Sequence, residues 1–387
     1  MTPINYKNQT MGIYIHIPFC RKKCDYCDFY SLPGCNSRFI DEYCRMVTDD
    51  ISRSADILED QLVSSIFLGG GTPSLLSGQQ INMILQQAYA SFRVLPDAEI
   101  TLEANPAALD MNKLEEYLQA GINRISLGVQ SFNDEELMIL GRLHKARHVL
   151  EAASMFNKCG LKNYSFDLIY GIPGQTIRSW ENNLHKAMEM APAHISTYLL
   201  QLDPETEMGK KVARRILTLL DEEIEAAMYE SAIDILAAGN YSQYEISNFS
   251  IKGYECQHNL SYWHGCNYLG IGAGAVSFIN NRRYAIISDV KQYMAAMQAG
   301  GQAPTEELEN MTAGERLADV LILGLRLVEG INIQAVNQCF NVDIMEEYKR
   351  EIEDNIKKGL LIIKNGQLSL TRRGYFISNS VLCHFVA

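Results

Sequence analysis

The sequence lacks any apolar run close to the roughly 20 residues that a membrane-spanning helix needs. The first stretch, Met1 to Met11, is polar and contains no apolar signal region. Hydrophobic residues make up 47% and charged residues 21% of the 387 residues, as in ordinary globular proteins. We therefore expect a cytoplasmic protein of one large and one smaller domain.

Basic side chains are also scarce relative to acidic ones. The chain has 34 Lys and Arg against 46 Asp and Glu, which gives a net charge of −12. A nucleic-acid partner normally requires a basic surface, so we expect none. Low-complexity segments and internal repeats are absent, apart from a β-α rhythm described below.

The ten cysteines show no disulfide framework, because most of them are scattered and no signal region precedes them. Several are expected to be ordinary buried or partly buried thiols, namely Cys35, Cys44, Cys159, Cys339 and Cys383. The exception is one loop in which Cys20, Cys24 and Cys27 follow C-x3-C-x2-C spacing.

This cysteine loop directly follows an apolar strand-like run, Gly12 to Phe19. Three thiolates that close in sequence can hold three irons of a [4Fe–4S] cube and leave the fourth iron open. A closed structural zinc site usually has two C-x2-C pairs instead. The spacing favours the cluster, with zinc and unliganded thiols as alternatives.

Six β-rich runs recur along the first half of the chain, mostly followed by helical patterns. The strands are expected at Gly12–Pro18, Ser64–Gly69, Ala98–Ala104, Asn123–Gln130, Lys162–Ile169 and Ala193–Leu200. The helices are expected at Arg38–Ser54, Gly78–Phe92, Asp110–Ala120, Ala146–Cys159 and Thr176–Met190. Such alternation predicts an α/β fold with a parallel sheet, here an open partial (β/α)6 barrel.

Unusual residues fall at the predicted C-terminal ends of these strands, where β/α barrels carry their reactive groups. Cys20 follows the first strand and a glycine run, 69–73, follows the second. Glu103, Gln130 and Asp167 lie at the ends of the third, fourth and fifth strands. The sequence therefore predicts a site at this rim of the barrel.

The pattern changes after Leu200. A long helix is expected at Asp221–Ala238, and strands at Tyr241–Phe249, within Asn267–Ile279 and at Arg283–Ile287. Helices at Ala313–Val328, Ile333–Cys339 and Ile344–Lys357 precede Leu360–Leu370, where Asn365-Gly366 predicts a hairpin. We expect a barrel at 1–215, a covering segment at 216–310 and a winged-helix-like domain at 311–387. Partner docking is favoured over DNA binding, because acidic and basic side chains balance in that last domain.

The cysteine loop resembles the signature of the radical S-adenosylmethionine (SAM) superfamily, C-x3-C-x-aromatic-C, with Tyr26 as the aromatic. The string Tyr14-Ile15-His16-Ile17-Pro18-Phe19-Cys20 resembles the branch of oxygen-independent coproporphyrinogen III dehydrogenases and HemW heme chaperones. The resemblance implies that the open iron of the cluster chelates SAM. One electron from the cluster then cleaves SAM to methionine and a 5′-deoxyadenosyl radical.

The same resemblance implies a set of SAM contacts. The glycine run, with Gly70, Gly71 and Thr72, would meet the SAM amino group, and Glu103 would contact bound SAM. Gln130 offers an amide to the SAM hydroxyls, and Asp167 would accept from the ribose. Arg142 would hold the methionyl carboxylate, with Tyr14 and Tyr26 beside the cofactor.

The stretch His258-Asn259-Leu260-Ser261-Tyr262-Trp263 is unusual because a histidine, an amide, a phenol and an indole fall within six residues. A lone histidine is more often a hydrogen-bonded core residue than a ligand. The H-N-x-x-Y-W string, however, resembles the motif that distinguishes HemW heme chaperones. The resemblance implies heme contact by His258, Asn259, Tyr262 and Trp263, with Cys256, His16 and His264 as other candidate ligands.

Two features separate the chain from the dehydrogenases. They carry a fourth cysteine two positions after the third, where this sequence has Phe29, and they have a longer N-terminal extension. We therefore expect a heme chaperone with a [4Fe–4S] cluster, SAM and heme, and coproporphyrinogen decarboxylation as the alternative. Expected partners are an apo-cytochrome or other hemoprotein and an electron donor, with peripheral membrane contact.

Overall fold

Six parallel strands form the centre of the protein. The computed structural model describes residues 10–55 and 61–386. The strands run in the order β1 (Met11–Ile17), β4 (Leu62–Gly70), β5 (Arg93–Ala104), β6 (Arg124–Gln130), β7 (Tyr164–Tyr170) and β8 (His194–Leu199). Each pairs in parallel with the next, as in an open barrel.

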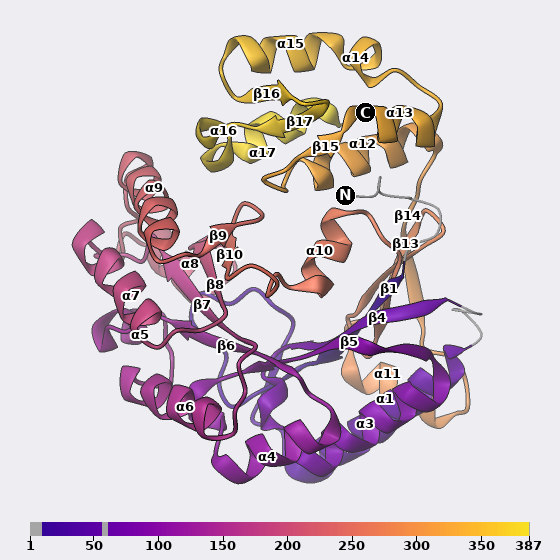
Figure 1. Ribbon diagram of the computed structural model, residues 1–387. Helices are drawn as coiled ribbons and strands as arrows, with labels where there is room; N and C mark the ends of the chain where they lie inside the picture. The colour runs from indigo at the N-terminus through magenta and orange to yellow at the C-terminus, as the bar shows by residue number, and fades with distance from the viewer. Residues whose placement is uncertain (1–9, 56–60, 387) are drawn as a thin grey trace.

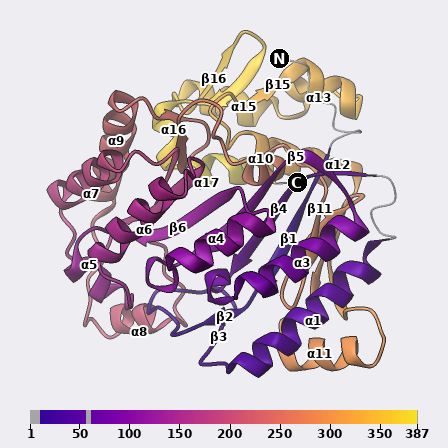
Figure 2. The ribbon, with the colours of Figure 1, turned by 60° about the horizontal axis from the view of Figure 1, so that its bottom comes forward.

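Helices cover the outer face of this sheet (Figures 1 and 2). They are α1 (Ser37–Arg53), α3 (Gly78–Ser91), α4 (Met111–Ala120), α6 (Ala146–Lys158) and α7 (Ile177–Glu189). Polar side chains fix where these helices begin. Ser77 and Gln80 form a capping box at α3, and Asp110 and Thr176 cap α4 and α7. The predicted strands and helices of the barrel are thus confirmed to within a few residues.

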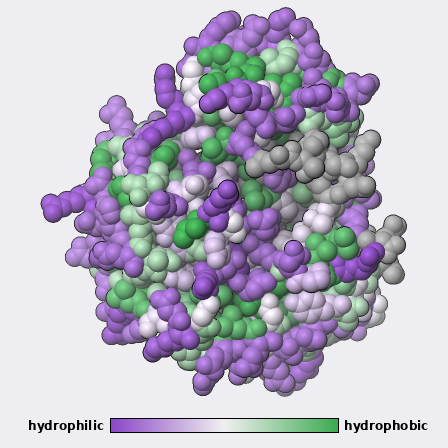
Figure 3. All heavy atoms as spheres, in the orientation of Figure 1, coloured by the Kyte–Doolittle hydropathy of each residue, from purple (hydrophilic) through white to green (hydrophobic). Residues whose placement is uncertain are grey.

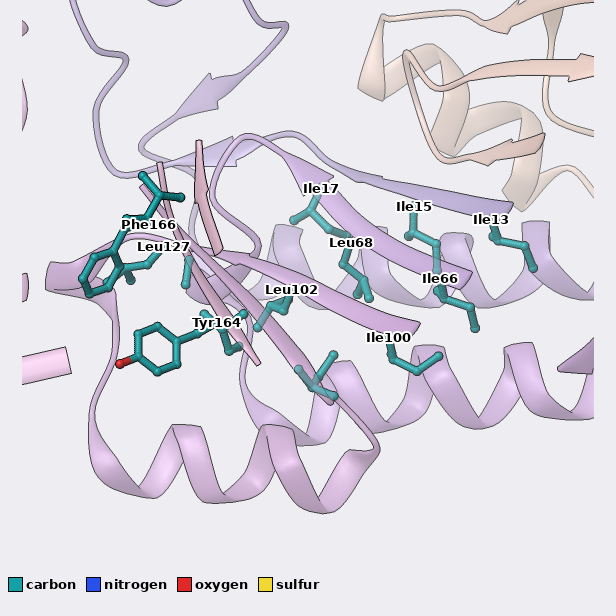
Figure 4. Packing of buried hydrophobic residues seen from close by; sticks show 14 of the residues in the cluster. Ile13, Ile15, Ile17, Ile66, Leu68, Ile100, Leu102, Leu127, Tyr164 and Phe166 are labelled. Carbon is teal, nitrogen blue, oxygen red and sulfur yellow. The ribbon is translucent and has the colours of Figure 1, made fainter. Parts of the chain in front are cut away.

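Alternate residues of the strands point to opposite faces, and one face is the main core. Ile13, Ile15 and Ile17 of β1 are fully buried and point toward the helices, as do Ile100 and Leu102 of β5 (Figure 4). The intervening residues of each strand face the interior of the barrel. Polar residues on that second face are therefore available for a site.

The sheet continues beyond the six strands on both sides. β11 (Tyr268–Ile271) pairs in parallel with β1, followed by antiparallel β12 (Val276–Ile279), β13 (Arg282–Ile286) and β14 (Thr305–Asn310). At the other edge lie β10 (Asn248–Ser250) and β9 (Ser242–Gln243). The predicted pairing of Arg283–Ile287 with the preceding glycine-rich segment is confirmed. The continuous strand predicted over Tyr241–Phe249 is wrong, because the chain turns back between β9 and β10.

Shorter elements complete this part of the chain. They are β2 (Phe19–Cys20), β3 (Leu32–Pro33), η1 (Pro73–Leu75), η2 (Pro106–Ala108), α5 (Asp134–Ile139), α8 (Glu207–Ala213), α9 (Glu222–Ala238), α10 (Gln257–Trp263) and α11 (Val290–Gln298). Among them α10 lies between the inner side of the sheet and the C-terminal domain (Figure 1). It contains the H-N-x-x-Y-W stretch, which therefore forms a helix.

The C-terminal domain has the helices and hairpin that the sequence predicts. It contains α12 (Ala313–Gly324), β15 (Ile331–Asn332), α13 (Ile333–Phe340), α14 (Ile344–Glu347), α15 (Lys349–Lys357), β16 (Leu361–Lys364), β17 (Gln367–Leu370), α16 (Arg372–Phe376), α17 (Ser378–Leu382) and η3 (Cys383–Phe385). Asn365 and Gly366 both have positive φ, +52° and +77°, as a type I′ turn requires.

Polar side chains cover most of the surface in the view of Figure 3, with apolar patches on the C-terminal domain at the top and on the lower body. Within the described ranges 10–55 and 61–386, every helix is too short or too polar to cross a bilayer.

Candidate functional site

The three cysteines of the loop lie together at the rim of the barrel. Cys20 ends β2, and the Cys27 N–H donates to the Cys24 carbonyl at 3.2 Å. All three thiols are half-buried. The Cys20 Sγ lies 3.5 Å from the Thr72 Oγ1, which joins the cysteine loop to the glycine run after β4.

Two short helices that the sequence did not reveal, α5 and α8, position this loop. The Asp25 N–H donates to the Leu140 carbonyl at 3.2 Å, just beyond α5. The Asp25 carbonyl accepts from the Met208 N–H at 2.7 Å, and its carboxylate pairs with Lys211 at 2.5 Å, both on α8. Asp25 therefore fixes the backbone between Cys24 and Cys27 through partners distant in sequence.

Arg142 lies against the cysteines and not in open solvent. Its guanidinium donates to the Gly128 carbonyl at 2.8 Å and to the Cys24 Sγ at 3.5 Å. Its buried Nε has no partner among the described residues. Burial raises the pKa of the Cys27 thiol to about 11. A soft metal centre that binds the thiolates would stabilise the ionised form and offset this increase in pKa. Arg142 offers an additional hydrogen-bond donor beside it.

Within the described part of the chain, no three His, Cys, Asp or Glu side chains are grouped as ligands of one metal ion. A [4Fe–4S] cluster does not need such a group, because each thiolate binds a different iron. The thiols and the neighbouring guanidinium thus fit an anionic cluster on the loop better than a four-coordinate zinc ion.

The glycine run allows the chain to pass close to β1 and to the cysteine loop. Gly70 has φ +109°, and a Cβ there would collide with the His16 ring. A Cβ on Gly71 would lie 2.7 Å from the Phe19 carbonyl oxygen. The run is therefore required by local packing, whether or not a ligand is bound.

Two carboxylates lie on the inner face of the sheet. Glu103 is half-buried and accepts from the Gly70 N–H at 3.1 Å. Burial, and next the negative charge of Asp167, raise the pKa of Glu103 to about 8. Asp167 accepts from three serine hydroxyls at 2.7–3.0 Å, those of Ser126, Ser165 and Ser196.

The other sequence-predicted SAM residues come from β6, from β1 and from the cysteine loop. Gln130 has φ +65° at a register shift between β6 and β7, an uncommon conformation for a non-glycine residue. The Tyr14 hydroxyl lies 3.0 Å from the His16 Nδ1. Burial raises the pKa of Tyr26, and the nearby Arg142 opposes that increase.

A buried carboxylate holds the N-terminal end of α10. Glu99 of β5 accepts from the backbone N–H groups of Gln257 and His258, both at 3.1 Å, and from the Cys256 thiol at 3.4 Å. Its other neighbour is Arg124 of β6, at 3.9 Å, and both side chains are more than nine-tenths buried. Helix α10 is therefore anchored to the inner face of the barrel.

His258 faces the barrel interior and is 1% exposed. Its Nδ1 lies 2.8 Å from the Ser65 Oγ, and its Nε2 lies 2.8 Å from the Tyr262 hydroxyl. The ring stacks on Phe67, with centroids 5.1 Å apart. Burial lowers its pKa to about 3, so the imidazole is neutral near pH 7. In this conformation neither ring nitrogen is open to a heme iron.

A cavity of about 400 Å³ lies beside α10, within the usual range for small-molecule sites. Its lining is largely aromatic: Tyr14, Phe29 and Tyr30 from β1 and the cysteine loop, Tyr262 and Trp263 from α10, and Tyr268 and Phe278 from the outer strands. Tyr14 and His16 of β1 both line the cavity. His258 and Asn259 are not among the described residues that line it.

One side of the cavity carries charge. Arg283 lies over the Phe278 ring, 5.3 Å from its centroid, and pairs with Asp319 of α12 at 3.2 Å. The indole Nε1 of Trp263 is buried without a partner among the described residues. A flat, mainly apolar ligand fits these rings and the indole donor, because the charge of Arg283 is already balanced by Asp319, which also lines the cavity.

Sequence reasoning missed Glu99, Arg124 and Arg283. The first two were detectable, because Glu99, Thr101 and Glu103 alternate along one strand, as do Arg124, Ser126, Gly128 and Gln130 along the next. Arg283 is placed at the cavity by pairing among β11, β12 and β13, which no local signal specifies.

Comparison with known proteins agrees with this site. The Radical SAM superfamily pattern matches residues 14–187, and the HemN C-terminal domain pattern matches residues 311–377. The chain is 33% identical over 376 residues to the heme chaperone HemW of Lactococcus lactis, with 96% of both chains covered. It is 39% identical over 265 residues to heme chaperone HemW of Escherichia coli, with 68% of this chain and 69% of that protein covered.

Among solved structures, the chain is similar to coproporphyrinogen III oxidase (HemN) from Escherichia coli, described as a radical SAM enzyme. The TM-score is 0.85 with 22% sequence identity, over 99% of this chain and 91% of that one. This similarity confirms the predicted fold class, a partial barrel with an added C-terminal domain.

The buried Glu99–Arg124 pair gives a prediction about stability. Glu99→Leu leaves Arg124 as an uncompensated buried charge and removes the α10 anchor. We expect a loss of about 3–5 kcal/mol in the free energy of unfolding, measured by denaturant titration. Glu115→Leu, on the exposed face of α4, is the control and should change it by about 0.5 kcal/mol or less.

The double variant Glu99→Leu/Arg124→Leu should be more stable than the sum of the two single losses predicts, because it leaves no unpaired charge. Strictly additive losses in the free energy of unfolding would contradict an energetic coupling between the two side chains.

Proposed function

Since the chain belongs to the HemW family of heme chaperones within the radical-SAM superfamily, we propose that it binds heme and transfers it to a hemoprotein. It does so as a protein that carries a [4Fe–4S] cluster and SAM, the cofactors that the superfamily implies. The observation that supports this function best is the aromatic cavity formed by Tyr262 and Trp263 beside the barrel rim. Heme is a flat apolar macrocycle with two carboxylates, and the cavity offers matching rings with Arg283 at its edge.

Cys20, Cys24 and Cys27 would hold the cluster. When bound, the cluster and SAM supply one-electron chemistry, while the protein supplies position and electrostatics. Arg142 donates toward Cys24 and partly neutralises the thiolate charge. Asp25 keeps the loop in place through α8. These contacts orient the ligands, and the half-buried loop limits access of water.

We propose the SAM contacts from the family resemblance, and the positions of the individual residues support them. Gly70, Gly71 and Thr72 lie between the cysteine loop and Glu103. Gln130 ends β6, Asp167 lies in β7, Tyr14 lies in β1 and Tyr26 lies in the cysteine loop. Arg142 is best described as a partner of Cys24 that keeps a free buried Nε for a SAM carboxylate. None of these residues is assigned a catalytic role.

Coproporphyrinogen decarboxylation is the less favoured alternative. Phe29 stands where the dehydrogenases carry their fourth cysteine, and its side chain is 63% exposed while lining the cavity. An apolar ring at the cavity mouth suits heme contact. It offers neither a thiol nor a proton donor to a tetrapyrrole substrate.

The partners follow from this role. The acceptor would be an apo-cytochrome or another hemoprotein, and an electron donor would reduce the cluster. The C-terminal domain, balanced in charge, would dock a protein and not nucleic acid. We place this exchange in the cytoplasm, with the acceptor at the membrane surface in the case of a respiratory cytochrome. We also propose that the barrel ends at residue 215 and that the covering segment ends at residue 310, where the C-terminal domain begins.

Cys24→Ala tests the cluster assignment. Because only three thiolates hold the cluster, the loss of one should abolish or degrade it. Anaerobically prepared wild type should contain about four iron and four sulfide per chain, whereas Cys24→Ala should contain far less. Cys383→Ala, an exposed thiol on η3, is the matched control and should keep a full cluster. Stoichiometric zinc without iron in wild type from iron-replete anaerobic cells would overturn the assignment.

Glu103 gives a pH-dependent prediction for SAM binding. Its pKa of about 8 means that the carboxyl is mostly protonated at pH 7 without ligand. SAM carries a permanent sulfonium charge, and a nearby cation favours the ionised carboxylate. Binding should therefore release a proton below pH 8, and SAM affinity should rise with pH up to about 8.

Calorimetry of SAM binding in buffers of different ionisation enthalpy measures this proton release. Glu103→Gln should release fewer protons at pH 7 and show a flatter dependence of affinity on pH. Identical proton release in wild type and Glu103→Gln would remove Glu103 as the linked group.

Heme titration and product analysis test the function itself. Ferric heme should bind at about one per chain with a shifted Soret band. With reductant, SAM and coproporphyrinogen III under anaerobic conditions, no protoporphyrinogen IX should form. Appreciable SAM-dependent decarboxylation would instead restore the dehydrogenase alternative, and the absence of saturable heme binding would contradict the chaperone role.

A further inference from the structure

The side chains of the aromatic cavity that could donate to a metal ion have partners within the protein. The His16 Nδ1 lies 3.0 Å from the Tyr14 hydroxyl, and its Nε2 lies 3.3 Å from the Tyr30 carbonyl oxygen. The Tyr262 hydroxyl lies 2.8 Å from the His258 Nε2, on the side away from the cavity lining. These contacts would have to break before the imidazole or either phenol could reach a metal ion in the cavity.

The thiol and the phenols that line the cavity are also held in their protonated forms. Burial raises the pKa of the Cys266 thiol to about 12, and only 8% of this residue is exposed. Burial likewise raises the pKa of the Tyr262 and Tyr268 phenols. Because the deprotonated form of such a group is the metal ligand, none of the three is prepared to bind iron near pH 7.

The charges beside the cavity balance within the protein. Arg283 lies 3.2 Å from Asp319, which also pairs with Arg316 at 2.7 Å, and Glu309 is a second partner of Arg283. Two guanidiniums therefore face two carboxylates. The network has no surplus charge among these four side chains, so a ligand is not required to bring a charge into the cavity.

The cavity offers ring surface instead, and cations outside it hold two of the rings. Trp263 comes from α10 and Phe278 from β12. The Arg326 guanidinium carbon lies 4.5 Å from the centroid of the Trp263 ring, and that of Arg316 lies 4.7 Å from the centroid of the Phe278 ring. Because these rings are already fixed, little side-chain freedom is lost when a flat ligand packs on them.

Phe29 marks the open side of the cavity. It belongs to the cysteine loop, and its side chain is 63% exposed although it lines the cavity. A ligand that reaches Phe29 keeps one edge in contact with water. The two carboxylates of a porphyrin can therefore remain solvated while its apolar face is buried.

Building on the proposed heme function, we propose that the cavity selects planar tetrapyrroles as a class, through contact with their ring faces and without a bond from the protein to iron. Heme is one member of this class. Metal-free protoporphyrin IX, which has the same ring and the same two carboxylates, is another. Both bury the same apolar surface against the aromatic walls, and this burial supplies most of the binding free energy. Affinity therefore depends on flatness and ring area.

The first experiment compares three ligands by absorbance titration of the anaerobically prepared protein. Ferric heme and metal-free protoporphyrin IX share the planar ring, whereas biliverdin is an open-chain tetrapyrrole with two carboxylates and no flat macrocycle. We expect the dissociation constants of heme and protoporphyrin IX to agree within about threefold, and that of biliverdin to be about tenfold larger or more. Bound ferric heme should show no imidazole, thiolate or phenolate signature in its absorption and electron paramagnetic resonance spectra.

Phe29→Ala tests whether ring contact carries the affinity. It removes an exposed ring from the cavity mouth and should weaken the binding of heme and of protoporphyrin IX together, by about tenfold. Leu150→Ala removes an exposed apolar side chain of α6 that does not line the cavity, and this matched control should leave both constants unchanged. Circular dichroism and iron content show whether each variant is folded and carries its cluster.

The proposal is overturned if wild type binds heme more than about tenfold tighter than protoporphyrin IX, because that difference would come from the iron. The variant that abolishes the difference, among His16→Gln, Tyr262→Phe and Cys266→Ala, would then identify the donor. Equal affinity for biliverdin, or unchanged affinities in Phe29→Ala, would contradict selection through ring faces. All these results retain heme binding and so contradict this proposal alone, whereas failure of wild type to bind either porphyrin would contradict the proposed function as well.

Discussion

A buried carboxylate needs hydrogen bonds and an opposite charge, and Glu99 obtains both by holding α10 against the barrel. Its oxygens accept from the first turn of that helix, and Arg124 supplies the charge. The position of α10 in turn places His258 against β1 and β4 and places Tyr262 and Trp263 at the cavity. The cavity thus depends on an ion pair in the barrel interior as much as on the aromatic residues that line it.

The two faces of the strands have different roles, one in the core and one in the site. In β1, the isoleucines at 13, 15 and 17 pack against helices, while Tyr14 and His16 face the rim. In β5, Ile100 and Leu102 join the same core, while Glu99 and Glu103 serve α10 and the glycine run. A shift of one residue in strand register would exchange these faces. Core packing therefore fixes the positions of the polar side chains that form the site.

Much of this arrangement was predictable from the sequence. The β-α rhythm predicted six parallel strands, and the positions of Cys20, Glu103 and Gln130 near strand ends predicted one rim. Asp167, predicted at the end of its strand, lies in the middle of β7 instead. Local patterns did not predict α5, α8 or α10, because they are short and their anchors are distant in sequence, such as Lys211 for the cysteine loop. They also gave no sign that His258 is enclosed, since its partner Ser65 lies 193 residues away.

The proposed function requires that this protein transfers heme directly to an acceptor. The most direct measurement is the rate of heme transfer from the loaded, anaerobically prepared protein to an apo-hemoprotein, followed by stopped-flow absorbance as acceptor concentration increases. The account predicts that this rate rises with acceptor concentration and exceeds the rate of spontaneous heme loss to an excess of a heme scavenger. A transfer rate that is independent of the acceptor and equal to spontaneous loss would contradict the account.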